Sequence, residues 1–151
     1  MSFKELLSPS SVAVVGASAN PSKVGHSVLE NLVHDGFEGD IYPVNPKAEE
    51  ILCLLSYASL QDISGGVELA VIVVPRDFVA RVLADCRKAS VRAAIVITAG
   101  FGEVGDKGWT LQRELVQEAR TGGITLLGPN CLGLINPWHK LNASFGLQDT
   151  R

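Results

Sequence analysis

Apolar runs without regular polar alternation recur along the chain, and four of them predict buried strands, the last interrupted only by Thr125. These runs cover residues 12–15, 69–74, 93–97 and 124–127. Runs without alternation are typical of parallel strands that are covered on both faces. Residues 40–44 predict a fifth, weaker strand, because Pro43 cannot donate a ladder hydrogen bond. We therefore expect this strand near an edge of the sheet.

Between these runs, apolar residues repeat at helical spacing over residues 24–33, 78–86 and 111–119. The first and third patterns stop at glycine-containing turns, which are common helix ends. Alternating strands and helices predict an α/β fold, a doubly wound and mostly parallel sheet in three α/β/α layers with right-handed crossovers. Ligands of such sheets bind beyond the carboxyl ends of the strands. The candidate functional segments are therefore residues 16–18, 45–47, 75–76, 99–102 and 128–131.

The loop after the first strand joins a strand to a helix start, where backbone N–H groups and the positive helix end can hold a phosphate. It does not match G-x-G-x-x-G, because Ala17 and Ser18 follow Gly16 and the next glycine is Gly25. Two interpretations stay open. The N–H groups around Ala17 and Ser18 form a phosphate cradle, or the loop is an ordinary strand-to-helix turn. The Ser18 hydroxyl is a candidate local-turn or cap residue that satisfies a free N–H, a role that can coexist with the cradle.

The end of the second strand discriminates better between ligands. An NAD-binding sheet places an acidic residue here for the ribose 2′-OH, whereas this chain has Asn45, Pro46 and Lys47. The Lys47 cation favours a sugar with an extra phosphate, which means coenzyme A or NADP, although lone lysines are often merely solvated. We expect Glu49 and Glu50 on a following helix, close enough to offer an acidic alternative. NAD is therefore disfavoured as a ligand but not excluded.

The bulk composition narrows the class of protein. A chain of 151 residues fits one domain that buries roughly 68–70% of its unfolded surface. A net charge of −3, with no basic run, argues against nucleic acid. No apolar run reaches the ~20 residues of a membrane span, and the charged start is no signal peptide. Three cysteines without a C-x-x-C spacing suit a reducing, cytoplasmic setting.

Five segments in register resemble the N-terminal CoA-binding domain of the ADP-forming (NDP-forming) acyl-CoA synthetases, relatives of the succinyl-CoA synthetase alpha subunit. The matching segments are VAVVGAS (residues 12–18) with Val24 and Gly25, YPVNPK (42–47), LAVIVVP (69–75), ITAGFGE (97–103), and GPNCLG (128–133) with Asn136 and Pro137. They cover nearly the whole chain in the family's order. One segment alone would be weak, but five together are specific.

The resemblance implies a CoA site along the strand-end loops, where small residues let a long ligand lie close to the backbone. It assigns Gly16, Ala17 and Ser18 to the diphosphate, Lys47 to the phosphorylated ribose or neighbouring phosphates, Val74 and Pro75 to the nucleotide and the start of the pantetheine arm, Ala99, Gly100 and Phe101 to that arm, and Asn130 and Cys131 to its thiol end.

The resemblance also implies a role for the parent protein. The complete synthetase makes acyl-CoA from an acid, ATP and CoA through acyl-phosphate and phosphohistidine steps. This chain alone is expected to bind CoA or acyl-CoA and to catalyse nothing. ATP, magnesium, the phosphohistidine and the ATP-grasp fold belong to further domains, in cis or on another subunit. We expect a CoA-binding domain over residues 1–146, with 147–151 a frayed tail or linker start, so that the chain is a fragment or a split gene product.

Three alternatives remain at this stage. The parent could be a protein acetyltransferase with a synthetase-like domain. The chain could be a free-standing CoA-binding or NAD(P)-binding regulatory module that acts through a partner. An NAD(P)-dependent oxidoreductase is weakened by the missing glycine fingerprint and the missing catalytic domain.

We expect no catalytic role for the cysteines and histidines of this chain. The resemblance implies that Cys131 lines the pocket, and we do not expect it to act as a nucleophile, because no histidine motif stands beside it. Cys53 and Cys86 are expected to be semi-buried thiols. The histidines at positions 26, 34 and 139 are expected to be surface or cap residues, and no spacing indicates a metal site. The family commonly has glycine in place of Cys53 and proline in place of Ala58, which puts the local loop geometry in doubt.

Overall fold

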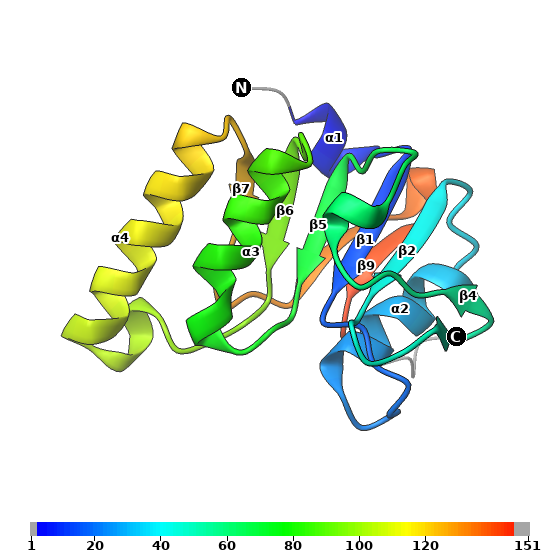
Figure 1. Cartoon of the computed structure of the whole chain (residues 1–151), viewed down its shortest axis with the longest axis horizontal. Helices are drawn as coiled ribbons and strands as arrows, with labels where there is room; N and C mark the ends of the chain where they lie inside the picture. The colour runs from blue at the N-terminus through cyan, green and yellow to red at the C-terminus, as the bar shows by residue number, and fades with distance from the viewer. Residues whose placement is uncertain (1–2, 147–151) are drawn as a thin grey trace.

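A parallel sheet of five strands forms the centre of the computed structural model, which describes residues 3–146 (Figure 1). Its strand order is β2-β1-β5-β6-β7. The strands are β1 (Ser11–Val15), β2 (Asp40–Val44), β5 (Leu69–Ile72), β6 (Ala93–Val96) and β7 (Thr125–Leu127). The predicted parallel sheet is confirmed, and β2 lies at the edge, as Pro43 indicates. The chain order reverses between β1 and β5, and such a switch point opens a crevice for a ligand.

Helices α3 (Arg76–Lys88) and α4 (Asp106–Thr121) cover one face of the sheet. Figure 1 shows both in front of the strands. The opposite face packs against α1 (Lys4–Leu7), α2 (Val24–His34) and an antiparallel hairpin of β8 (Gly133–Asn136) and β9 (Leu141–Ser144). Each central strand alternates between the two cores, since Ala13 and Val15 face α3 whereas Val12 and Val14 face α2. The three predicted layers are therefore present, with an unpredicted hairpin in one of them.

Several boundaries differ from the predicted ones. Strand β5 ends at Ile72, so Val73 and Val74 belong to the loop that follows it. The expected helix after β2 is wrong, because Glu50 opens a two-residue strand β3 (Glu50–Ile51) that pairs with β4 (Leu54–Leu55). Single 3₁₀ turns lie at η1 (Leu60–Asp62), η2 (Gly102–Val104) and η3 (Pro137–His139). The predicted tail over residues 147–151 lies outside the described residues.

The cysteines also depart from expectation. Cys53 is exposed and Cys86 is fully buried, so neither is semi-buried. Burial raises the pKa of the Cys86 thiol to about 12, with the Asp85 charge adding to the effect. All three cysteines are free. Across residues 3–146, no helix is both long and apolar enough to cross a bilayer.

The tight turn between β3 and β4 explains why a glycine would suit position 53. Leu52 and Cys53 occupy the turn with φ values of +50° and +63°. A left-handed conformation costs most L-residues about 1–2 kcal/mol, and two-residue hairpin turns of this kind favour Asn-Gly.

We expect Cys53→Gly to raise the free energy of unfolding by about 0.5–1 kcal/mol, since glycine's larger unfolded-state entropy offsets part of the relieved strain. The melting temperature should rise by roughly 2–4 °C per kcal/mol for a domain of this size. Cys53→Ala is the matched control, because it removes the thiol and keeps the Cβ. An equal gain in both variants would contradict the backbone explanation.

Candidate functional site

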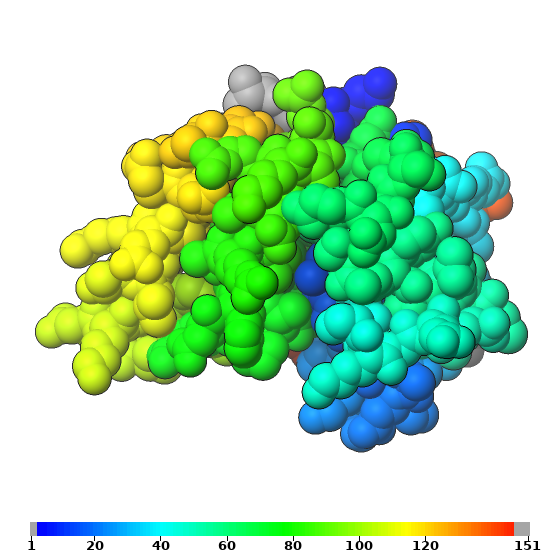
Figure 2. Space-filling model, viewed as in Figure 1, coloured from blue at the N-terminus to red at the C-terminus, as the bar shows by residue number. Residues whose placement is uncertain are grey.

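A hollow of about 940 Å³ lies at the carboxyl ends of β1, β2 and β5. Figure 2 shows it between the green α3 and the cyan-to-teal segment that follows β2, with dark-blue atoms at its floor. The volume is in the range of small-molecule sites. It sits at the switch point of the strand order, where this fold class binds its ligands.

The loop between β1 and α2 supplies unpaired backbone donors to this pocket. Helix α2 begins at Val24, with Lys23 as its N-cap, so it starts later than the Ser18 cap interpretation requires. The Ser18 hydroxyl instead accepts the Asn20 N–H at 3.0 Å and shapes the loop. Among the described residues, no acceptor meets the N–H groups of Ser18, Ala19, Val24 and Gly25. These donors, at a helix N-terminus without an acidic residue in its first turn, favour an anion.

Two glycines let this loop lie against the start of α2. A Cβ built on Gly25 would stand 2.0 Å from the carbonyl oxygen of Gly16, closer than any real contact. Gly16 itself has a φ of +98° and lies against Val73. Gly25 therefore provides a close helix-to-loop approach like that of the third glycine in the G-x-G-x-x-G fingerprint of dinucleotide-binding sheets, at a different spacing.

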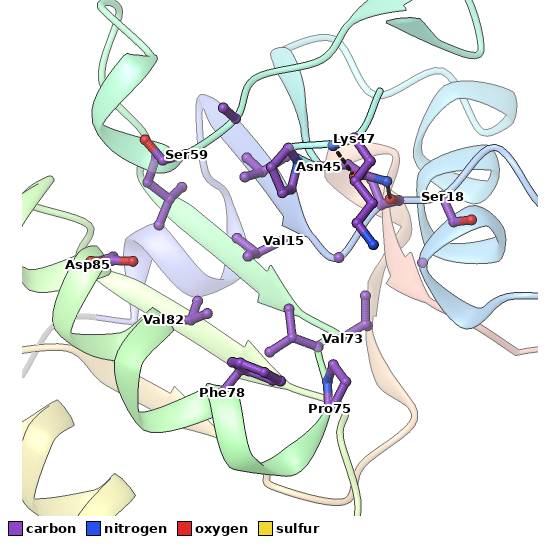
Figure 3. Close-up of a pocket in the computed structure, with 18 of the residues that line it drawn as sticks. Val15, Ser18, Asn45, Lys47, Ser59, Val73, Pro75, Phe78, Val82 and Asp85 are labelled. Atoms are coloured by element: carbon purple, nitrogen blue, oxygen red, sulfur yellow. Dashed lines mark hydrogen bonds between the residues drawn. The ribbon is translucent and has the colours of Figure 1, made fainter. Parts of the chain in front are cut away.

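Asn45 connects the loops that follow β1 and β2. Its Nδ2 donates to the Ala17 carbonyl at 2.9 Å, and its Oδ1 accepts the Lys47 N–H at 2.8 Å. The Lys47 side chain is exposed and extends from this turn into the pocket, as Figure 3 shows. Sequence reasoning quoted Asn45 in the motif and did not assign it a role in the site.

One face of helix α3 forms a further wall of the pocket. The sequence analysis did not predict this wall. Phe78, Arg81, Val82 and Asp85 line the pocket from this helix. Figure 3 shows Phe78 and Val82 directed into the hollow, across from Lys47. Three cations now surround the pocket, namely Lys23, Lys47 and Arg81, and within residues 3–146 none of them forms an ion pair.

The predicted site residues fall into two groups. One group lines the pocket and comprises Gly16, Ala17, Ser18, Lys47, Val74 and Pro75. The other group lies outside it, on the loops after β6 and β7, and comprises Ala99, Gly100, Phe101, Asn130 and Cys131. The Phe101 side chain is buried in the core beside α4, so only its backbone can face a ligand. Burial raises the pKa of the half-buried Cys131 thiol, which donates to the Val96 carbonyl.

Thr98 joins the two groups through hydrogen bonds. Its hydroxyl donates to the Val74 carbonyl at 2.6 Å, and its carbonyl accepts the Asn130 N–H at 3.0 Å. The loops after β5, β6 and β7 are thus tied side by side. A long ligand that starts in the pocket could extend along this row of loops.

The Glu103 carboxylate holds the loop after β6 in place. One of its oxygens accepts hydrogen bonds from the N–H groups of both Gly100 and Phe101. Arg76 donates to the Gly100 carbonyl from the other side at 3.1 Å. The hydrogen bond from Gly100 lowers the pKa of Glu103 most, followed by other backbone donors and the nearby Arg76 charge.

This lowered pKa predicts a pH dependence of stability. A carboxyl whose pKa is lower in the folded state contributes stability above its ordinary pKa and loses it as the pH falls through the folded value. We expect the wild type to exceed Glu103→Gln in unfolding free energy at neutral pH, and the difference to shrink below pH 4.5, the ordinary value. Denaturant titrations between pH 3 and 7, with the exposed Glu114→Gln on α4 as control, measure this difference. A pH-independent difference would contradict the assignment.

The histidines differ from one another. His34 and His139 are exposed, as expected, but the expectation for His26 is wrong, since its ring is buried and its Nδ1 lies 2.9 Å from the Ser18 carbonyl oxygen. Across residues 3–146, no group of three or more His, Cys, Asp or Glu side chains could hold a metal ion.

Known proteins match this chain closely. A family model described as CoA binding domain matches residues 10–137. The alpha subunit of ADP-forming acetate–CoA ligase I from Pyrococcus furiosus is 44% identical over 99% of the chain, and the ADP-forming acetate–CoA ligase of Methanocaldococcus jannaschii is 44% identical over 95%. The structure of the dinucleotide forming acetyl-coenzyme A synthetase 1 of Ca. Korarchaeum cryptofilum, in complex with phosphate and ADP, has a TM-score of 0.94 and 46% identity over 99% of the chain.

The chain spans only part of these proteins. It covers 33% of the Pyrococcus subunit, 20% of the Methanocaldococcus ligase and 32% of the Korarchaeum chain. The family model nevertheless extends over β1 through β8, and so over every wall of the pocket. Fold, pocket position and sequence all agree, and the chain belongs to the family of CoA-binding domains.

Proposed function

We propose that this chain binds coenzyme A in the pocket at the ends of β1, β2 and β5, as the CoA-binding domain of an ADP-forming acyl-CoA synthetase. The observation that carries the proposal is the meeting of unpaired backbone donors and three cations in one hollow of this CoA-binding family member. CoA is a polyanion with a diphosphate and a 3′-phosphate, so it suits this set of groups.

Each part of the pocket has a matching part of the ligand. The N–H groups at the start of α2 and the neighbouring Lys23 suit the diphosphate. Lys47 lines the hollow from the turn after β2 and Arg81 lines it from α3, and both suit the phosphorylated ribose. Phe78 and Val82 offer an apolar face for a flat base. The pantetheine arm would then pass Val74 and follow the loops tied together by Thr98 toward Cys131.

The parent activity is a proposal by relationship. The curated relatives named above are acetate–CoA ligases, and this chain corresponds to a fifth to a third of their length. We infer that the complete protein joins an acid to CoA at the expense of ATP, with the remaining synthetase domains in cis or as a second subunit. The three free cysteines support a cytoplasmic setting.

Calorimetric titration of the domain with CoA, dephospho-CoA, NAD and NADPH tests the proposal. We expect saturable binding of CoA, weaker binding of dephospho-CoA, and no comparable binding of the nicotinamide nucleotides. Tight binding of NADPH without binding of CoA would replace the proposal with an NADP-dependent function.

A further inference from the structure

His26 is buried directly beneath the proposed diphosphate loop. It is the third residue of α2, and the residue is only 7% exposed. Helical side chains lean toward the N-terminus of the helix, which directs the ring to the preceding loop. Its Nδ1 lies 2.9 Å from the Ser18 carbonyl oxygen. Because a carbonyl only accepts, Nδ1 carries the proton and Nε2 of the neutral ring does not.

Two side chains hold two consecutive carbonyls of this loop. Asn45 donates to the Ala17 carbonyl from the loop after β2, and His26 donates to the Ser18 carbonyl from α2. Both peptide bonds are trans, so each N–H points away from the carbonyl of the same plane. Asn45 therefore sets the direction of the Ser18 N–H, and His26 sets the direction of the Ala19 N–H.

We propose that His26 is a positioning residue, whose Nδ1–H bond to the Ser18 carbonyl aims the Ala19 N–H at the CoA diphosphate. The inference rests on the proposed function. Among the described residues the Ala19 N–H has no acceptor, so it is available to a phosphate oxygen. His26 acts through the peptide between Ser18 and Ala19 and does not itself touch the ligand. A loop held from both sides also loses less conformational entropy when the ligand binds.

Two substitutions distinguish a positioning role of His26 from a role in packing alone. His26→Leu fills the space without a donor, whereas His26→Asn keeps an N–H donor attached to Cγ, where Nδ1 stands. We expect His26→Leu to weaken CoA about three- to tenfold, as for the loss of one hydrogen bond, and His26→Asn to restore most of the affinity. The matched control is His34→Leu, on the exposed last turn of the same helix.

The choice of ligand tests the direction of the effect. Adenosine 3′-monophosphate lacks the diphosphate, so His26→Leu should bind it as the wild type does in an NMR titration. Equal losses for CoA and for this nucleotide would overturn the inference, as would unchanged CoA binding by a folded His26→Leu.

A measurement without ligand keeps the inference separate from the proposed function. The ¹⁵N shifts of the His26 ring in the free domain should report the tautomer that carries its proton on Nδ1. The opposite tautomer overturns the positioning inference, even where the wild type binds CoA. A wild type that shows this tautomer and binds no CoA overturns the proposed function instead.

Discussion

Gly25→Ala is expected to weaken CoA binding by about 100-fold or more. The new Cβ would stand 2.0 Å from the Gly16 carbonyl oxygen, although real Cβ contacts stay beyond 3.0 Å, so the helix start or the loop must move by about 1 Å. This movement separates the N–H donors of the loop from those of α2. Hydrogen bonds to charged groups contribute about 1.5–3 kcal/mol each, and the loss of two exceeds a factor of 100.

The same substitution sets two effects on stability against each other. Helix propensity alone favours alanine over glycine by about 1 kcal/mol. Overpacking against a fixed backbone costs about 1–3 kcal/mol, so we expect a net loss of up to about 2 kcal/mol. Ser27→Ala, two residues later in α2, is the matched control and should leave CoA binding intact. Wild-type affinity in a folded Gly25→Ala would mean that the loop donors do not hold the ligand.

Lys47→Ala is expected to weaken CoA by about 10- to 150-fold, which corresponds to the 1.5–3 kcal/mol of a hydrogen bond to a charged group. The Lys47 ammonium reaches into the pocket, and within residues 3–146 it has no ion-pair partner. If it meets the 3′-phosphate, the variant should bind dephospho-CoA about as well as the wild type does. Calorimetry with both ligands measures the contrast.

The control for Lys47 is Lys107→Ala, an exposed lysine on α4 outside the pocket. Equal losses of affinity for CoA and dephospho-CoA would indicate that Lys47 binds the diphosphate and not the 3′-phosphate. Unchanged affinity for both would leave Lys47 as a solvated lysine, and Arg81 on the α3 wall of the pocket would become the candidate for the sugar phosphate.

The centre of the sheet was predictable because β1, β5 and β6 are buried on both faces. Burial of every residue in β1, β5 and β6 produces the continuous apolar runs that the sequence displays. The β3–β4 pair has only two residues in each strand, too few for any periodicity. The β8–β9 hairpin is half exposed and carries polar residues, so neither strand resembles a central one.

The part of the candidate site that lies in the strand-end loops was predictable from the sequence. The loop of Gly16 and the turn of Lys47 follow strands directly, so the ends of the strands locate them. The wall on α3 was missed because the pattern over residues 78–86 was used only to predict a helix, and candidate ligand contacts were sought only in the loops at the strand ends. Core contacts use Val79, Leu83 and Cys86, whereas Phe78, Arg81, Val82 and Asp85 form a second stripe at helical spacing. That stripe was the available signal, and its mixture of apolar and charged residues concealed it.

The role of His26 could not be predicted from the sequence, for a different reason. Its role depends on a hydrogen bond to a carbonyl eight residues earlier, and this contact exists only once the loop folds back on α2. No spacing rule in the sequence predicts which carbonyl a helical histidine will meet.

Every residue found to line the pocket lies between Val15 and Asp85, in the first part of the chain. Strands β6 and β7 extend the sheet beyond β5. Neither these strands nor α4 contribute a residue to the walls of this pocket. If the pocket binds CoA as proposed, every wall that meets the nucleotide is encoded by one contiguous block of sequence, whereas the loops after β6 and β7 are encoded after α3. Substitutions after α3 are then expected to alter the far end of the ligand's path without changing a wall of the nucleotide pocket.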